Sequence, residues 1–157
     1  MKSKYVILAS ALLISVSNFA QKDQIKAAEK ALKNGNAVEA VATLKQAEAT
    51  IGAATEAEKA QYYFVKGNSH ADLANKKMEI TKNNVEAGKA YQQVLAIEKA
   101  SGKSKYSADA QIGLSKIKDD LLNAAQIEAK KETKEGSLNA ANLLYASYEL
   151  DKTNMQN

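Results

Sequence analysis

The feature that most limits the fold of this chain is that none of its 157 residues is proline. Proline ends or kinks helices, because it lacks a backbone N–H and its ring clashes with the preceding turn. Alanine supplies 29 residues, and all 22 basic residues are lysine, so strong helix formers dominate the composition. A chain of this length has room for one domain with a real core. Together these features predict an all-α domain.

The residue types that are missing exclude several classes of site. Without cysteine the chain has no disulfide, no thiolate metal site and no cysteine nucleophile. His70 is the only histidine, so the usual zinc spacings cannot be built. Arginine is absent as well, which removes bidentate recognition of phosphate or guanine. We therefore expect no metal, no cofactor and no nucleic-acid partner.

Residues 1–20 have the pattern of a secretory signal peptide. Lys2 and Lys4 precede an apolar run over residues 6–16, and polar sequence begins directly after Ala20. The apolar run is too short to span a bilayer, which needs about 20 residues. We predict cleavage after Ala20, export to the periplasm or the medium, and no membrane contact other than through this segment. The alternatives are a buried N-terminal helix and an uncleaved anchor.

Cleavage would leave residues 21–157 as the helical domain. Two lysines leave with the signal segment, so the net charge falls from +4 to +2. Such a mild excess of lysine is not the basic surface that nucleic-acid binding requires. Because the domain has no cysteine, helix packing alone must hold it together.

Turn residues and caps divide the domain into six predicted helices. Glycines at positions 35, 52, 102 and 136 mark breaks between periodic segments. No segment alternates with a period of two, so strands are not expected. Residues 76–84 are polar and are interpreted as a loop or a frayed helix end. The predicted helices cover residues 23–33, 36–51, 55–75, 83–99, 104 or 107 to 133, and 137 onward.

Three of these helices open on a capping box, in which an N-cap side chain and a Glu three residues later satisfy free backbone N–H groups. The connections are short, which places consecutive helices antiparallel and predicts three helical hairpins in a row. The boxes are Asn36 with Glu39, Thr55 with Glu58, and Asn83 with Glu86.

Most of the predicted helices carry an apolar face at helical spacing, and these faces predict the core. In the fifth helix the spacing is 3-4, which buries one seam. The predicted core residues are Val38, Val41, Leu44 and Ile51; Tyr62, Val65 and Leu73; Ala87, Tyr91, Val94 and Leu95; Ala110, Leu114, Ile117, Leu121 and Ala124; and Leu138, Ala141, Leu144, Tyr145 and Tyr148.

A small–large–small triplet recurs in the second helix of each hairpin, where it lets two helices approach closely around one bulky side chain. The triplets are Ala40, Leu44 and Ala47; Ala87, Tyr91 and Val94; and Ala140, Leu144 and Ser147. On these residues the chain resembles the tetratricopeptide repeat family, and Tyr63, Gly67 and His70 fit the first helix of that repeat. The resemblance implies an α-solenoid of about three irregular hairpins.

The chain departs from the family pattern in repeat length. The alanines that open the triplets, at positions 40, 87 and 140, stand 47 and 53 residues apart, whereas a standard repeat has about 34. The proline that usually ends the repeat is replaced by Gly52, Lys99 and Lys152. An ordinary helical bundle is therefore the alternative fold.

No arrangement of residues predicts catalysis. His70 is the one side chain suited to proton transfer at neutral pH, and it lies at a packing position of a helix. Asp119 and Asp120 are adjacent, so they point to different helix faces and do not form a carboxylate pair. We expect a structural histidine and no enzyme; an enzyme that relies on His70 is the hypothesis of a different class.

The family resemblance implies a groove lined by the first helix of each hairpin. Ile25 and Phe64 would form an apolar pair in it, ringed by amides and carboxylates and suited to a peptide or a helix. The alternative for Phe64 is that it fills the interface between helices. The implied groove residues are Gln61, Phe64, Asn68 and Asp72 in the second hairpin, and Lys22, Ile25, Glu29 and Leu32 in the first.

The last helix supplies a second candidate surface, because Leu144, Tyr145 and Tyr148 are predicted to leave an apolar patch exposed. The sequence as a whole predicts an exported, non-catalytic scaffold that binds a peptide or partner protein through a helical groove. One alternative is a structural or assembly protein of the cell envelope that forms a homo-oligomer through the last hairpin. Another is a fragment of a longer repeat protein.

Overall fold

The structure is a computed structural model that describes residues 21–155, with side chains described up to Asp151. Six α-helices and one short 3-10 helix make up this part of the chain, which contains no strand, so the all-α prediction is confirmed. The predicted signal segment lies outside the described residues. The helices cover residues 21–33, α2 Ala37–Ala47, η1 Ile51–Ala53, α3 Glu56–Asn75, α4 Ile80–Ser101, α5 Ser107–Ala129 and α6 Lys134–Met155.

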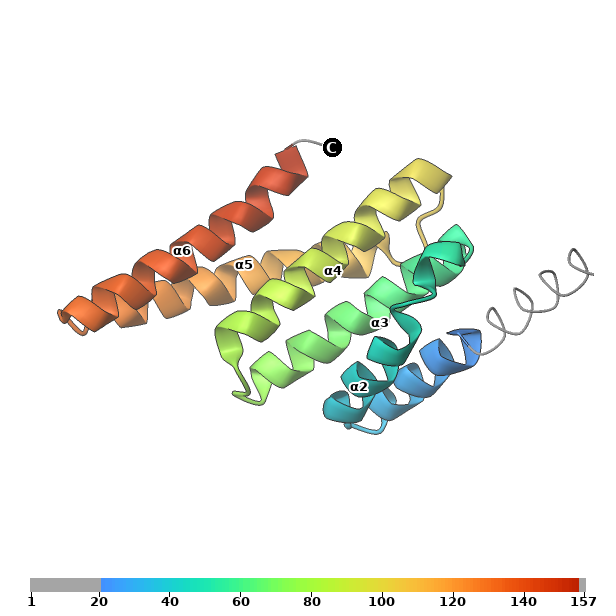
Figure 1. The fold of residues 1–157 in the computed structure, drawn as a ribbon. Helices are drawn as coiled ribbons and strands as arrows, with labels where there is room; N and C mark the ends of the chain where they lie inside the picture. The colour runs from blue at the N-terminus through green and yellow to red at the C-terminus, as the bar shows by residue number, and fades with distance from the viewer. Residues whose placement is uncertain (1–20, 156–157) are drawn as a thin grey trace, which may run out of the picture.

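Each helix packs against the next one along the chain, and the chain reverses direction at every turn (Figure 1). The most extensive contact joins α3 to α4, and the contacts of α5 with α6 and of α4 with α5 come next. Alternate helices, α3 with α5 and α4 with α6, touch over smaller areas. Antiparallel hairpins therefore follow one another in chain order, as the short connections predict.

The buried side chains form two apolar clusters. One lies between residues 21–33, α2, η1 and α3, and includes Leu44 and Tyr62. The other lies between α4, α5 and α6, and includes Leu114 and Leu121. Tyr63 on α3 packs against both clusters, so α3 is the helix that joins the two halves of the core.

Tyr91 on α4 is wedged between two glycines from neighbouring helices. A β-carbon added at Gly67 on α3 would lie 2.7 Å from one edge of the Tyr91 ring, and one added at Gly113 on α5 would lie 2.6 Å from the other edge. The Tyr91 hydroxyl donates a hydrogen bond to Asn68 Oδ1 at 2.7 Å. The predicted contact between helices around Ala87, Tyr91 and Val94 is thus present, and the glycines explain how three helices approach so closely.

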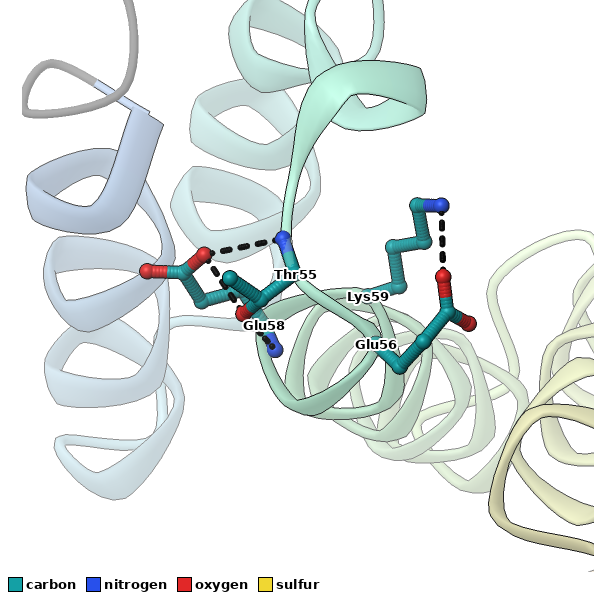
Figure 2. A network of polar contacts seen from close by, with 4 residues as sticks. All are labelled: Thr55, Glu56, Glu58 and Lys59. Atoms are coloured by element: carbon teal, nitrogen blue, oxygen red, sulfur yellow. Dashed lines mark hydrogen bonds and ion pairs between the residues drawn. The ribbon is translucent and has the colours of Figure 1, made fainter. Parts of the chain in front are cut away.

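The capping box at the start of α3 is formed as predicted (Figure 2). Thr55 Oγ1 accepts from the backbone N–H of Glu58 at 3.3 Å, and the backbone N–H of Thr55 donates to the Glu58 carboxylate at 3.1 Å. Hydrogen bonds from Thr55 hold the pKa of Glu58 below its ordinary value. At the start of α2, Asn36 Oδ1 likewise accepts from the backbone N–H of Glu39, at 3.2 Å.

The third predicted box, Asn83 with Glu86, is wrong, and so is most of the loop predicted over residues 76–84. Helix α4 begins at Ile80, after Glu79 turns the chain with a positive φ of 37°. Asn83 sits in the first turns of α4 and is 4 % exposed. Its Nδ2 donates to the backbone oxygen of Met78, and its Oδ1 lies 2.7 Å from His70 Nδ1. Asn83 bonds to α3 and to the turn, and this alternative to capping is invisible in the sequence.

The predicted boundary between the last two helices is also wrong. Helix α5 ends at Ala129 and α6 begins at Lys134, so Gly136 lies inside the first turn of α6. The Gly136 N–H donates to Thr133 Oγ1 at 3.0 Å, which makes Thr133 the cap. A β-carbon at position 136 would lie 2.5 Å from the backbone oxygen of Glu128, so this glycine permits a tight turn and does not end a helix.

Several predicted core positions face solvent. On α2, Val38 is 55 % exposed, because Ala37 and Ala40 occupy the side that meets the neighbouring helices. On α6 the predicted core face is wrong: its buried side is made by Ala140, Leu143, Ser147 and Leu150. In the third triplet the large residue Leu144 therefore points outward, unlike Leu44 and Tyr91.

Candidate functional site

The four groove residues predicted on α3 lie on one side of that helix, and all are half-buried. Each also has a partner inside the protein. Gln61 donates to the Glu29 carboxylate at 2.9 Å, and the Phe64 ring stacks on Tyr106 with centroids 4.7 Å apart. Asn68 accepts from Tyr91, as described above, and Asp72 pairs with Lys76 at 2.7 Å. This side of α3 is therefore a seam between helices, and the stacking favours the alternative that Phe64 fills an interface.

Ile25 cannot be part of a binding surface, so this predicted site residue is corrected. Its side chain is 1 % exposed and belongs to the core cluster with Leu44 and Tyr62. Ile25 and Phe64 do not form the predicted apolar pair, because Ile25 packs inside the first core cluster whereas Phe64 stacks on Tyr106. The first predicted helix is short and carries no strong repeat motif, so its sequence does not fix which of its sides faces the core.

A cleft of about 290 Å³ lies at one end of this seam. The start of α3, residue Lys22 and the connection between α4 and α5 form its walls. Lys103 and Lys105 face it from the connection, and Glu56 and Glu58 face it from α3 (Figure 2 shows this end of α3). The charges are mixed, and Gln61 is the predicted groove residue that reaches it.

Glu98 is a buried carboxylate at the edge of this cleft, 2 % exposed. It accepts hydrogen bonds from the backbone N–H of Tyr106 at 3.0 Å and from the backbone N–H and hydroxyl of Ser107 at 2.8 and 2.6 Å. Burial raises its pKa, and these hydrogen bonds lower it further than burial raises it, so the pKa lies below its ordinary value. Since α5 has no cap of its own, a side chain of α4 caps it.

His70 has a structural role in this arrangement. Asn83 Oδ1 can only accept, so His70 Nδ1 donates this hydrogen bond, which ties α3 to the start of α4. His70 also lines a second cleft of about 260 Å³, which is lined as well by the ion pair of Lys66 with Glu48. The predicted assignment of His70 to packing agrees with this geometry.

The outer side of α6 carries four large apolar side chains in solvent, which we call the α6 stripe. Leu138 is 62 % exposed, Leu144 50 %, Tyr145 65 % and Tyr148 54 %. The opposite side of α6 packs on α4 and α5, and Leu150 covers Gly88 of α4. The exposed patch predicted at Leu144, Tyr145 and Tyr148 is therefore present, and Leu138 extends it.

Among residues 21–155, no helix is long and apolar enough to cross a membrane. In the same range, no group of three or more His, Asp or Glu side chains is placed to hold a metal ion. Sequence reasoning missed Glu98, because its role depends on Tyr106 and Ser107, which the fold brings to it from the start of α5. No protein-family model, curated protein or solved structure matches the chain.

Proposed function

We propose that this chain is a non-catalytic protein–protein interaction module built from tetratricopeptide-like hairpins. The observation that carries the proposal is the α6 stripe, in which four large apolar side chains on one helix are each at least half exposed. Scattered exposed apolar residues are ordinary, but a contiguous apolar patch of this kind marks a surface that meets another protein. Tyrosine is also among the residues that contribute most to binding at interfaces.

The seam on α3 is the weaker candidate surface within the same proposal. Its polar groups already have partners, and Phe64 is stacked on Tyr106. A peptide bound along it would have to compete with these contacts, at a cost for each group left unpaired. The stripe needs no such rearrangement.

Chemical cross-linking tests the proposal directly. A C-terminally tagged full chain is cross-linked in an extract of the source cell, and the captured proteins are identified. We expect one partner that is lost with Tyr145→Asp and retained with Val38→Asp, which places the same charge at an exposed valine on α2. Capture that is lost with Phe64→Ala and unaffected by Tyr145→Asp would move the binding surface to α3. Capture unaffected by all three variants would refute both surfaces.

Self-association through the exposed apolar side chains of the α6 stripe is the second candidate function. Leu138 and Tyr145 lie seven residues apart on one side of α6, centred on Ala141 and Asn142. A two-fold axis at this centre would set Leu138 of each copy against Tyr145 of the other, as a symmetric interface requires. Light scattering separates the two functions: a dimeric mass that Tyr145→Asp reduces to the monomer supports self-association, and a monomeric wild type contradicts it.

We also infer that the chain is exported and cleaved after Ala20. The inference rests on the lysines, the short apolar run and the polar boundary of residues 1–20. N-terminal sequencing of the protein from the cell envelope or the medium tests it. A mature chain that starts at Gln21 is the expected result, and a chain that keeps Met1 in the soluble cell extract would contradict it.

A further inference from the structure

The helix over residues 21–33 begins with a buried glutamine. Gln21 is 3 % exposed, although glutamine is mostly an exposed residue in folded proteins. It lies four residues before Ile25 and seven before Ala28, so the three side chains share one side of the helix. Ile25 and Ala28 are both buried in the core cluster that also holds Leu44 and Tyr62. Gln21 therefore lies at the end of the side that meets the core.

The side-chain amide of Gln21 is not satisfied in this position. Two buried side-chain atoms make no hydrogen bond within the described part of the chain, Gln21 Nε2 and Asp72 Oδ2. The Asp72 carboxylate has an ion pair with Lys76 at 2.7 Å. Among the described residues, Gln21 Nε2 is thus the buried polar atom that has no partner of either kind. Such a group is costly, and native proteins rarely keep one without a reason.

The cleavage proposed after Ala20 would make Gln21 the first residue of the mature chain. Its new α-amine would then stand at the N-terminus of a helix, where the free backbone N–H groups already form the positive end of the helix dipole. The adjacent Lys22 and Asp23 carry opposite charges, so they do not compensate a further positive charge. This position therefore favours the uncharged amine, which is the nucleophilic form.

We propose that Gln21 cyclises to pyroglutamate once the signal segment has been removed, an inference that rests on the proposed cleavage after Ala20. The lone pair of the α-amine attacks Cδ of the same residue, and a bond forms between the backbone nitrogen and Cδ. The bond from Cδ to Nε2 breaks, and Nε2 takes one proton from the amine and leaves as ammonia. The reaction needs no oxidant, reductant or second substrate.

The lactam ring suits this end of the core better than the glutamine does. Cyclisation expels the one atom that has no partner, Nε2, and it replaces a charged amine by a neutral N–H. Both reacting groups belong to one residue, so ring closure needs no encounter between separate molecules. Because no hydrogen bond from a described residue holds Nε2, none has to be broken. The closed chain would also offer no free α-amine to an aminopeptidase.

Intact mass spectrometry tests the proposal on the full chain, produced with residues 1–20 in the source cell and purified from the envelope or the medium. We expect a chain that starts at residue 21 and is lighter by one ammonia, with the loss assigned to residue 21 by fragmentation. A synthetic peptide of residues 21–27 is carried through the same steps and should keep its ammonia. A mature chain with an unreacted Gln21, or equal cyclisation of the peptide during preparation, would overturn the proposal.

Gln21→Asn is the matched control. Asparagine keeps the amide but is one methylene shorter, and the ring that it would close with the α-amine is too strained to form. We expect this variant to keep its ammonia at residue 21. Fragmentation also separates cyclisation from succinimide formation at Asn34, which precedes Gly35 and would cause the same loss of mass. A loss located at Asn34 in the wild type, with none at Gln21, would overturn the proposal.

The same spectra distinguish failure of the inference from failure of the proposed cleavage. A mature chain that starts at a residue other than Gln21 would overturn both. A chain that starts at Gln21 with a free α-amine would overturn cyclisation alone and leave the cleavage standing. The interaction module is decided separately, by cross-linking with Tyr145→Asp.

Discussion

Helices α4 and α6 are the second helices of neighbouring hairpins, and each has 22 residues. Helix α4 packs against α3, α5 and α6, and its Tyr91 is 3 % exposed. Helix α6 packs against α5 and part of α4, and its Tyr145 is 65 % exposed. In Figure 1, α4 lies within the stack of helices and α6 lies at its edge.

The difference teaches that similar helices become core or surface according to what covers them. Tyr91 has a glycine on each side and a hydrogen-bond partner in Asn68, and burial raises the pKa of its hydroxyl to about 12. Tyr145 and Tyr148 have no helix over them among the described residues. We therefore expect α4 to contribute most to stability and the outer side of α6 to contribute to binding.

The largest effect is expected for Tyr91→Ala. The substitution leaves a cavity between Gly67 and Gly113 and removes the bond to Asn68, so we expect a loss of about 3–5 kcal/mol in the free energy of unfolding. Urea denaturation followed by circular dichroism measures it. Tyr148→Ala, on the exposed side of α6, should change stability by less than about 0.5 kcal/mol. Equal losses from the two variants would contradict the comparison.

The next largest effect is expected for Gly67→Ala. Alanine is the better helix former by about 1 kcal/mol, but its β-carbon would lie 2.7 Å from the Tyr91 ring. The ring cannot yield, because movement away from Gly67 pushes it into Gly113. We expect a net loss of about 1–3 kcal/mol by thermal or urea unfolding. Gly52→Ala is the control, since a β-carbon at position 52 would meet nothing within 4 Å. If Gly67→Ala were more stable than the wild type, the close packing of Tyr91 against Gly67 would be contradicted.

One carboxylate on each helix, Glu98 on α4 and Asp151 on α6, extends the comparison from tyrosines to charged side chains. Glu98 of α4 is buried and caps α5, whereas Asp151 of α6 pairs with Lys118 at a surface where its side chain is 48 % exposed. We expect Glu98→Gln to cost about 1–3 kcal/mol and Asp151→Asn less than about 1 kcal/mol. Chemical denaturation of both variants at pH 7 tests this, and a larger loss for Asp151→Asn would contradict it.

The pH dependence of stability gives a second reading of Glu98. Its pKa is lowered in the folded protein, so its contribution is present above the ordinary value of 4.5 and is lost as pH falls through the folded pKa. Glu29, Glu58 and Glu128 also have lowered pKa values and share in the acid loss. The wild type should therefore lose stability more steeply below about pH 4.5 than Glu98→Gln. Parallel acid titrations would contradict the assigned role.

The smallest effect on stability is expected for Tyr145→Asp. Because Tyr145 is 65 % exposed, the free energy of unfolding should change by no more than about 0.5 kcal/mol. The effect appears instead in association, measured as the mass in light scattering at increasing concentration. If the wild type self-associates, an unchanged mass in the variant would remove the α6 stripe as its interface.

Prediction from the sequence succeeded where the signal was local. Thr55 and Glu58 lie within one helical turn, so their capping box could be read directly, and Tyr91 followed from its spacing to Ala87 and Val94. The sequence-based prediction failed where a side chain has both a local and a distant partner available to it. Asn83 was read as a cap and instead bonds to His70, and Ile25 was read as a groove residue and is buried in the core.

The sequence by itself determined that the chain is helical and where α2, α3 and α5 begin. Those properties depend on backbone propensity, turns and caps, which involve residues within a few positions of each other. Only the tertiary structure decided that Gly67 and Gly113 receive Tyr91, that Glu98 caps α5, and that Tyr145 meets solvent. Burial depends on which surfaces of distant segments meet, and a periodic apolar pattern does not say which of its members will be covered.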